Sequence, residues 1–265
     1  MTFKYFDAHS HIEGDEFNAD REELLSKMMK ENIGTVAVGV DKESSESAVA
    51  LAEKYEHVFS AVGQHPTETN SVFDDEAFMK LANNNRTVAI GECGLEYFRI
   101  DNVVEARSKQ IPLFESQIAL AVKVNKPLMI HARPSEKSMD AYHDIIDLLK
   151  SAKREYGDSL TGNMHFFAGG VDEARAFLEL GFTISYTAVI TFARDYDEAI
   201  RFAPRDMILS ETDSPYVAPA SRRGTRNDPL AVKDVVSTLA DIRGESEESM
   251  RVSTVGNAMR LFKLI

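Results

Sequence analysis

The chain of 265 residues has 43% apolar composition, enough for one large core and a length typical of a (β/α)8 barrel. Its formal net charge of −13 argues against a broad cationic surface that binds nucleic acid. An anionic substrate would have to be bound by a few basic side chains near the site. Cys93 is the only cysteine, which excludes an intrachain disulfide framework and fits a reducing compartment. The start, MTFKYFDAHSH, resembles neither a signal peptide nor a membrane span, so we expect a cytoplasmic protein.

Short runs rich in valine, isoleucine, phenylalanine and threonine alternate along the chain with longer amphipathic stretches. The short runs predict strands at residues 5–9, 35–40, 58–63, 87–92, 127–131, 163–167, 182–186 and 207–211. The longer stretches predict helices at residues 20–31, 44–54, 75–84, 104–124, 135–155, 171–180, 195–202, 229–242 and 246–262. This alternation is typical of βα units around a parallel sheet, and no linker interrupts it. We therefore predict one domain, residues 1–265, folded as an α/β (β/α)8 barrel of the TIM type.

Five of the seven histidines stand close to the end of a predicted strand, and two carboxylates join them. In a parallel barrel every strand delivers its last residues to the same rim, where barrel enzymes place their chemistry. Imidazole and carboxylate together suit a borderline divalent ion. The sequence therefore predicts a metal site at the C-terminal rim, with these candidate ligands: His9, His11, Glu92, His131, His165 and Asp213.

Each candidate ligand also has a simpler interpretation. A histidine can be satisfied by backbone hydrogen bonds in the core, and Glu92 can belong to a structural salt bridge. A carboxylate at the end of a buried strand is costly without such compensation, and it can bridge two ions through its two oxygens. We assign that bridging role to Glu92. Asp213 could ligate the ion beside His9 and His11 and accept a proton from water, while Glu211 could orient a neighbour or serve a purely structural role.

Four other residues near these segments receive minor roles. Asp7 could orient a histidine ligand or fill a layer of the barrel. His57 precedes its predicted strand, so we expect it at the opposite rim. His143 lies within a predicted helix, where it should face solvent or pack. Cys93 should point away from Glu92 across the strand and serve in packing.

Basic residues at the same rim are candidates for phosphate binding. The segment ASRRGTRN, after the eighth predicted strand, is the densest basic cluster of the chain, and this position is a common phosphate site in barrels. Arginine pairs bidentately with phosphate oxygens, so we assign phosphate contacts to Arg133, Arg222, Arg223 and Arg226. Solvated surface charge is the alternative. His65 would lie outside the ligand cluster and contact phosphate or shuttle a proton, because its unperturbed pKa is near neutrality.

The chain resembles the TatD-type metal-dependent deoxyribonucleases, within the wider group of amidohydrolase-like barrels. The resemblance runs nearly end to end through DAHSHI, GQHP, GECGLEY, QIPLFESQIALAVKVNKPLMIHAR, HFFAGG, ETDSPY, RGTRNDP and NAMRLF. It implies that the six candidate ligands hold two divalent ions, magnesium, manganese or zinc, and that the protein hydrolyses phosphodiesters in DNA, often from a 3′ end. It implies no membrane association and no obligate protein partner.

Some positions depart from the usual pattern of that family. Cys93 and Glu96 stand where isoleucine and aspartate are more frequent, Phe166 where cysteine is frequent, and Asp228 where glutamate is common. None of these departures removes a proposed ligand. Glu92 also distinguishes the chain from relatives in which a carboxylated lysine bridges the ions.

The leading hypothesis is thus two-metal phosphodiester hydrolysis, with Asp213, Glu92 and His65 as catalytic residues. A second hypothesis keeps the metals but replaces DNA with a small ester, lactone, amide or aminoacyl-tRNA, because this barrel supports many chemistries. A third is a noncatalytic interaction protein on an old barrel.

Overall fold

The computed structural model describes residues 3–264. All eight predicted strands are present, and each differs from its predicted bounds by no more than a few residues. They pair in parallel in the order β1 to β8. Their bounds are Tyr5–Ser10 (β1), Ile33–Val38 (β2), Val58–Val62 (β3), Thr87–Glu96 (β4), Leu128–Arg133 (β5), Gly162–Met164 (β6), Thr183–Tyr186 (β7) and Ile208–Ser210 (β8).

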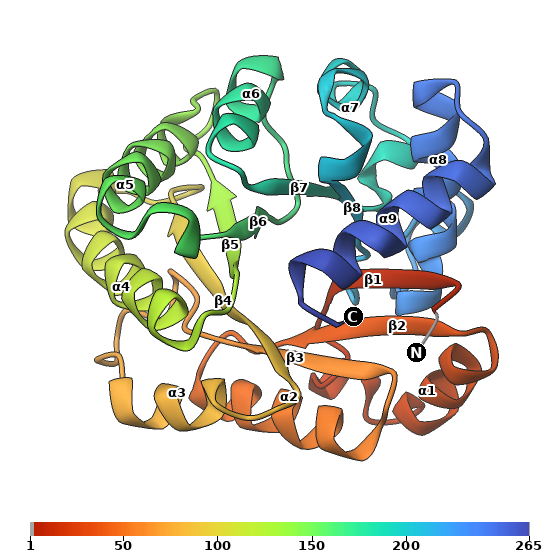
Figure 1. Ribbon diagram of the computed structural model, residues 1–265, viewed down its shortest axis with the longest axis horizontal. Helices are drawn as coiled ribbons and strands as arrows, with labels where there is room; N and C mark the ends of the chain where they lie inside the picture. The colour runs from red at the N-terminus through yellow and green to blue at the C-terminus, as the bar shows by residue number, and fades with distance from the viewer. Residues whose placement is uncertain (1–2, 265) are drawn as a thin grey trace.

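The predicted helices are also found, and they surround the strands (Figure 1). Their bounds are Arg21–Lys30 (α1), Lys42–Lys54 (α2), Asp75–Ala82 (α3), Val103–Val124 (α4), Asp140–Tyr156 (α5), Val171–Glu179 (α6), Asp197–Phe202 (α7), Val232–Arg243 (α8) and Glu247–Leu261 (α9). Side-chain caps define several starts, because an acceptor there satisfies a free backbone N–H. Asp41 accepts from Ser44 N at 2.8 Å, and Asp74 accepts from Ala77 N at 3.1 Å.

Two helices begin three or more residues later than predicted. The backbone and hydroxyl of Ser135 donate to the Asp140 carboxylate at 2.9 and 2.6 Å, so residues 135–139 form a closed turn and α5 starts at Asp140. Pro229–Ala231 forms a 3-10 turn ahead of α8. None of the helices within residues 3–264 is long and apolar enough to cross a membrane.

Contacts between the last strand and the first close the barrel. His11 N donates to Ser214 O at 2.8 Å, and Asp213 N donates to His9 O at 2.9 Å. Ser10 and Ser214 form a parallel bridge just beyond β8. The chain segments that carry His9, His11 and Asp213 are therefore held side by side at the rim.

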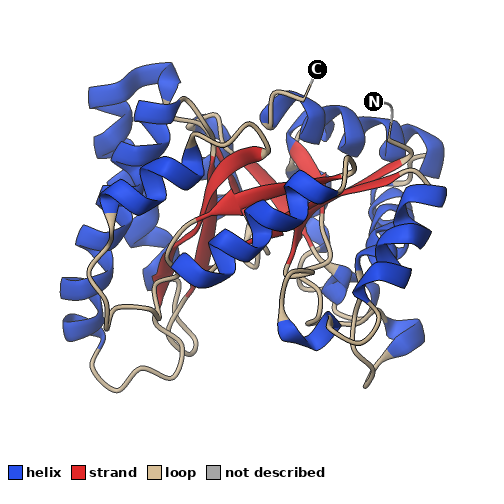
Figure 2. Cartoon of the chain, turned by 90° about the horizontal axis from the view of Figure 1, so that it is seen from below, coloured by secondary structure: helices blue, strands red, loops and turns tan. Residues whose placement is uncertain are grey.

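Two hydrophobic clusters fill the molecule. The larger lies between the strands and the surrounding helices. The smaller takes residues from six strands and from α9 but from none of α1 to α8, so it occupies the barrel interior with α9 beneath it. Figure 2 shows the helices outside the strands and the longer loops gathered along one edge. One end of the barrel is thus packed, and polar side chains collect at the other.

Strand β4 runs past Glu92, where it was predicted to end, because two glycines let it lie close to β5. Gly91 has a φ of 145°, and a Cβ there would be 2.3 Å from Met129 O. Gly94 has a φ of 138°, and a Cβ there would be 2.0 Å from His131 O. Only glycine tolerates both the conformation and the contact. The close approach brings Glu92 alongside His131.

Candidate metal centre

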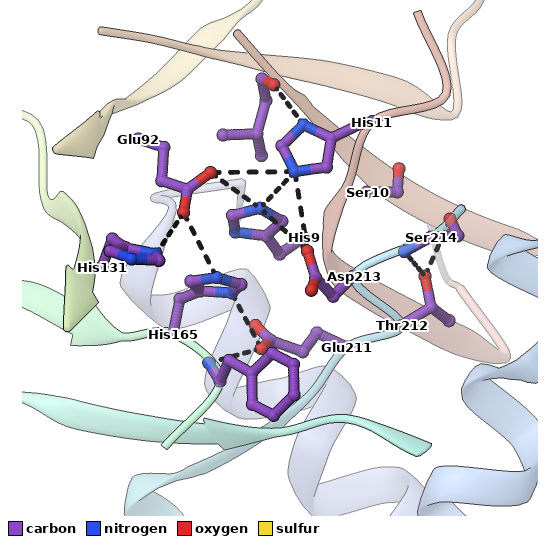
Figure 3. A network of polar contacts seen from close by, with 12 residues as sticks. His9, Ser10, His11, Glu92, His131, His165, Glu211, Thr212, Asp213 and Ser214 are labelled. Atoms are coloured by element: carbon purple, nitrogen blue, oxygen red, sulfur yellow. Dashed lines mark hydrogen bonds and ion pairs between the residues drawn. The ribbon is translucent and has the colours of Figure 1, made fainter. Parts of the chain in front are cut away.

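The two carboxylate oxygens of Glu92 face two separate pairs of imidazoles (Figure 3). Glu92 Oε2 lies 3.6 Å from His9 Nε2 and 3.7 Å from His11 Nε2. Glu92 Oε1 lies 2.8 Å from His131 Nδ1 and 3.4 Å from His165 Nε2. The carboxylate is 4% exposed, so it is removed from water at the centre of the cluster. One side chain thereby divides four histidines into two groups.

Asp213 belongs to the first of these groups. Its Oδ1 lies 3.7 Å from His9 Nε2 and 3.5 Å from His11 Nε2. The residue directly follows the segment that bridges β8 to β1, with its own backbone bonded to His9. The structure therefore brings all six predicted ligands to one rim, in the arrangement that the strand ends indicated.

Three of the four histidine nitrogens that face away from Glu92 have their own acceptors, and the fourth, His9 Nδ1, is buried without a partner within residues 3–264. His11 Nδ1 lies 2.8 Å from Val38 O, which can only accept a proton. His165 Nδ1 lies 2.9 Å from Glu211 Oε1, and His131 Nε2 lies 3.1 Å from Glu96 Oε2. A proton held on each of these outer nitrogens leaves a lone pair on the nitrogen that faces Glu92. Neutral imidazoles fixed in this way are the form that binds a divalent ion, so the residues present fit a metal centre.

Burial and charge shift the pKa values inside the cluster in opposite directions. Burial opposes ionisation of Glu92, but His65, His131 and His165 outweigh it and hold the pKa of Glu92 well below its usual range. Burial also opposes protonation of His165, yet Glu211 and Glu92 raise its pKa well above the ordinary value. For His9, burial and the neighbouring His165 lower the pKa instead. A crowded set of nitrogens with one central carboxylate is a setting in which cations can take the place of protons.

Glu211 orients His165, which was one of its two predicted roles. Besides the bond to His165, its Oε1 accepts from Phe166 N at 2.6 Å and its Oε2 accepts from Ser185 Oγ at 2.6 Å. Asp7 does not orient an imidazole ring. Its carboxylate accepts from Thr212 N at 2.8 Å and Thr212 Oγ1 at 2.7 Å, so it joins β1 to the segment after β8.

His65 lies inside the cluster, although the sequence placed it outside. Its Nε2 is 3.6 Å from Glu92 Oε1, and its ring centroid is 4.4 Å from that of His131. Burial, with the nearby His131, lowers the pKa of His65 to about 3. The predicted proton shuttle assumed a pKa near neutrality, which this environment does not provide. Its Nδ1 lies 2.7 Å from Thr67 Oγ1, which fixes the ring at the edge of the second histidine group.

The four candidate phosphate-binding arginines separate into two kinds. Arg222 pairs with Asp228 at 2.7 Å, and Arg226 forms two bonds with Asp20 at 2.9 and 2.5 Å. These ion pairs favour the surface-charge alternative for both residues. Arg133 and Arg223 lie over aromatic rings, with Cζ 4.1 Å from the Phe98 centroid and 4.2 Å from the Phe192 centroid respectively. Neither has a carboxylate partner among residues 3–264, so these two stay available for an anion.

The three residues assigned away from the site lie where the sequence placed them. His57 lies just before β3, at the opposite end of that strand from His65. His143 is exposed on α5, with Nε2 3.4 Å from Glu173 Oε1. Cys93 is buried in the larger hydrophobic cluster, and burial raises its thiol pKa well above the usual value.

Several residues that support the site were not recognised from the sequence. Glu96 was noted only as a departure from the family pattern, yet its carboxylate contacts His131. Gln110 and Gln117 lie on the buried face of α4, among residues that read as an ordinary amphipathic helix. Polar glutamines on that buried face were the available signal, because buried amides require partners.

A family model described as TatD related DNase matches residues 6–263. The chain belongs to the TatD-related DNase family. Over 264 residues it is 33% identical to a Bacillus subtilis relative named as the uncharacterized metal-dependent hydrolase YabD, covering 98% of this chain and 99% of the relative. As a TatD family member, the chain is a metal-dependent hydrolase.

Two further TatD relatives extend the comparison. A Salmonella typhimurium protein named 3′-5′ ssDNA/RNA exonuclease TatD is 28% identical, with 98% of this chain and 99% of that protein covered. The crystal structure of YJJV, a TatD homolog from Escherichia coli, superposes with a TM-score of 0.87 at 24% identity and covers 99% of both chains. The second match confirms the predicted TIM-type barrel. The predicted single domain of residues 1–265 stays a prediction, and it includes residues 1, 2 and 265, which lie outside the described residues.

Proposed function

We propose that the chain hydrolyses phosphodiester bonds in DNA as a 3′–5′ exonuclease that uses two divalent ions. The observation that carries the proposal is the position of Glu92, whose two oxygens each face a different pair of histidines. Two ions joined by one carboxylate are a recurrent arrangement in phosphoryl-transfer enzymes. The name of the Salmonella typhimurium TatD relative supports nucleic acid as the substrate class.

The cluster divides into two sets of ligands under this proposal. His9, His11, Asp213 and Glu92 Oε2 would hold one ion, and His131, His165 and Glu92 Oε1 the other. Nitrogen and oxygen ligands together admit magnesium, manganese or zinc. When bound, the ions would lower the pKa of water and offset charge on the oxygens of the phosphate.

The residues of the chain supply the remaining functions. Asp213, beside the first histidine pair, would accept the proton of the attacking water. Glu211 and Glu96 would keep His165 and His131 in the correct orientation. Arg133 and Arg223 would hold substrate phosphates, since no carboxylate within residues 3–264 neutralises either one. His65 lies beside the second histidine pair, where it would exclude water or contact the phosphate.

Single-stranded DNA labelled at either end tests this function. Metal-loaded wild-type protein should shorten the single strand from its 3′ end. It should degrade duplex DNA more slowly than single-stranded DNA. His131→Ala should reduce the rate by at least about 100-fold, in line with the loss of an essential metal-site group. His143→Ala is the matched control, because that histidine is exposed on α5. Intact DNA with the wild-type protein, or equal rates for wild type and His131→Ala, would exclude nuclease activity of this site.

A second candidate is hydrolysis of a small ester, lactone, amide or aminoacyl-tRNA by the same metal centre. It is favoured by the net charge of −13 and by the ion pairs that occupy Arg222 and Arg226. Salt separates the two candidates. Affinity for a substrate with several phosphates should fall steeply as the salt concentration rises, whereas affinity for a neutral small substrate should not.

A further inference from the structure

Two arginines lie over the same aromatic ring at the rim of the barrel. The Cζ atom of Arg133 is 4.1 Å from the Phe98 ring centroid, and that of Arg99 is 4.8 Å from it. Neither guanidinium forms an ion pair with a carboxylate within residues 3–264. Arg107, by contrast, pairs with Asp144 at 2.6 Å.

Arg133 and Arg99 adjoin the second histidine pair, which consists of His131 and His165. Arg133 lies opposite Glu96 in the pairing of β5 with β4, and Tyr97 N donates to Arg133 O at 2.7 Å. The carboxylate of Glu96 accepts from Phe98 N at 2.8 Å through Oε1 and lies 3.1 Å from His131 Nε2 through Oε2. One carboxylate therefore links the Phe98 backbone to a proposed metal ligand.

The strand geometry points in the same direction. Arg133 stands two residues after His131 in β5, and side chains two apart in a strand project to the same face. The Arg133 side chain consequently leaves β5 on the same face as His131. A substrate held at the metal centre would pass this position.

The guanidinium groups of Arg99 and Arg133 are suited to binding an anion. A phenyl face attracts each guanidinium by a cation–π interaction but neutralises neither charge. A group that accepts bidentate hydrogen bonds from a guanidinium would offset that charge. Phosphate is such a group, and arginine is more suitable than lysine for contacting it in a fixed plane.

We propose that Phe98, Arg99 and Arg133 form a subsite for a second phosphate of the substrate, adjacent in the strand to the phosphodiester that is cleaved. The inference rests on the proposed function and deepens it. It assigns Arg133 to the neighbouring phosphate and gives Arg99 a role that the sequence did not indicate. The substrate is then a polynucleotide, since a lone phosphodiester cannot fill the subsite.

Binding of fluorescein-labelled trinucleotides to the metal-free protein, followed by fluorescence anisotropy, tests the subsite without using activity. Arg99→Ala should raise the Kd about 10-fold and reduce the salt slope by about 0.7, the value for one contact with a single strand. Arg175→Ala is the matched control. Arg175 is exposed on α6, lies with Cζ 4.5 Å from the Phe202 centroid, and has no carboxylate partner within residues 3–264.

Trinucleotides carrying a neutral methylphosphonate at one position identify the phosphate. With the wild-type protein, methylphosphonate at one position should weaken binding as much as Arg99→Ala does. Methylphosphonate at that position should not weaken binding to the Arg99→Ala protein any further. Arg99→Lys should give an intermediate Kd, because it keeps the charge and loses the bidentate geometry. The subsite would be contradicted if Arg99→Ala weakened the binding of every trinucleotide, modified or unmodified, by the same factor. It would also be contradicted if the Kd of the Arg99→Ala protein equalled that of wild type. If metal-loaded wild type binds the trinucleotide but cleaves no phosphodiester, the proposed function fails while the subsite stands.

Discussion

Gln117 of α4 holds both backbone groups of Gln64, the residue before His65. Its Oε1 accepts from Gln64 N at 2.8 Å, and its Nε2 donates to Gln64 O at 2.8 Å. Two helical turns earlier, Gln110 binds Glu96 in the same way, at 2.9 and 3.0 Å. One helix thus fixes the ends of β3 and β4 through two buried amides, and with them the positions of His65 and Glu96.

Gln117→Met should destabilise the protein, because it leaves the N–H and C=O of Gln64 buried without partners. Each buried unsatisfied group costs about 1–3 kcal/mol, so with two such groups the free energy of unfolding should fall by about 2–6 kcal/mol. Urea unfolding measures the change. Glu115→Gln, at an exposed position on the same helix, is the control and should shift stability by less than about 0.5 kcal/mol. A loss within that limit for Gln117→Met would show that Gln64 finds other partners.

Glu211→Gln should weaken metal binding rather than unfold the barrel. The amide has the same shape but no negative charge, and when its oxygen accepts from His165 Nδ1 and Phe166 N, its NH2 group cannot accept from Ser185 Oγ. Loss of such support typically costs about 10–100-fold in metal affinity. Isothermal titration with Zn²⁺ provides the measurement, and Glu179→Gln on the exposed end of α6 provides the control. An unchanged affinity would remove Glu211 from the site.

Cys93 should be unreactive in the folded protein. The thiol is buried, and burial raises its pKa well above the usual value, so little of the reactive thiolate forms at neutral pH. Ellman's reagent should label it only after denaturation, at one thiol per chain. Rapid labelling under native conditions would mean that β4 opens. Cys93→Ala should retain metal binding, because the side chain packs among hydrophobic residues away from Glu92.

His57 should make the folded state less stable in mild acid. Burial lowers its pKa below the unfolded value of about 6.5, and its Nε2 is buried without a hydrogen-bond partner within residues 3–264. The stability that the neutral ring contributes is complete above about pH 6.5 and declines as the pH falls toward the folded pKa. Urea unfolding at pH 7.5 and 5.5 should therefore show a larger loss for wild type than for His57→Gln, by at most about 1.4 kcal/mol per pH unit. Parallel curves would contradict this.

The sequence predicted the barrel and the six candidate ligands because both depend on local patterns. Strand-like runs that end in histidine or carboxylate specify a shared rim once the topology is known, and no long-range detail is required. The sequence could not predict the ion pairs of Arg222 and Arg226. Arg226 contacts Asp20, 206 residues away in the chain, and only the folded barrel brings them together.

The same limit applied to the arrangement around Phe98 and to His65. The sequence assigned no role to Arg99, since its approach to the Phe98 ring depends on the turn after β4. The pKa of His65 depends on burial and on imidazoles from other strands, so a sequence gives only its unperturbed value. Local spacing therefore predicted which candidate ligands meet at one rim, while the electrostatics of the site required the structure.

Mn²⁺ titration monitored by electron paramagnetic resonance tests most directly whether Glu92 joins two ions. We expect two Mn²⁺ per chain and an exchange-coupled spectrum for wild type, because under the proposed function Glu92 would bridge the pair. Glu92→Gln should abolish the coupling, and His143→Ala should preserve it. A single uncoupled Mn²⁺ per chain in a wild-type protein that is fully active on DNA would contradict the two-ion account.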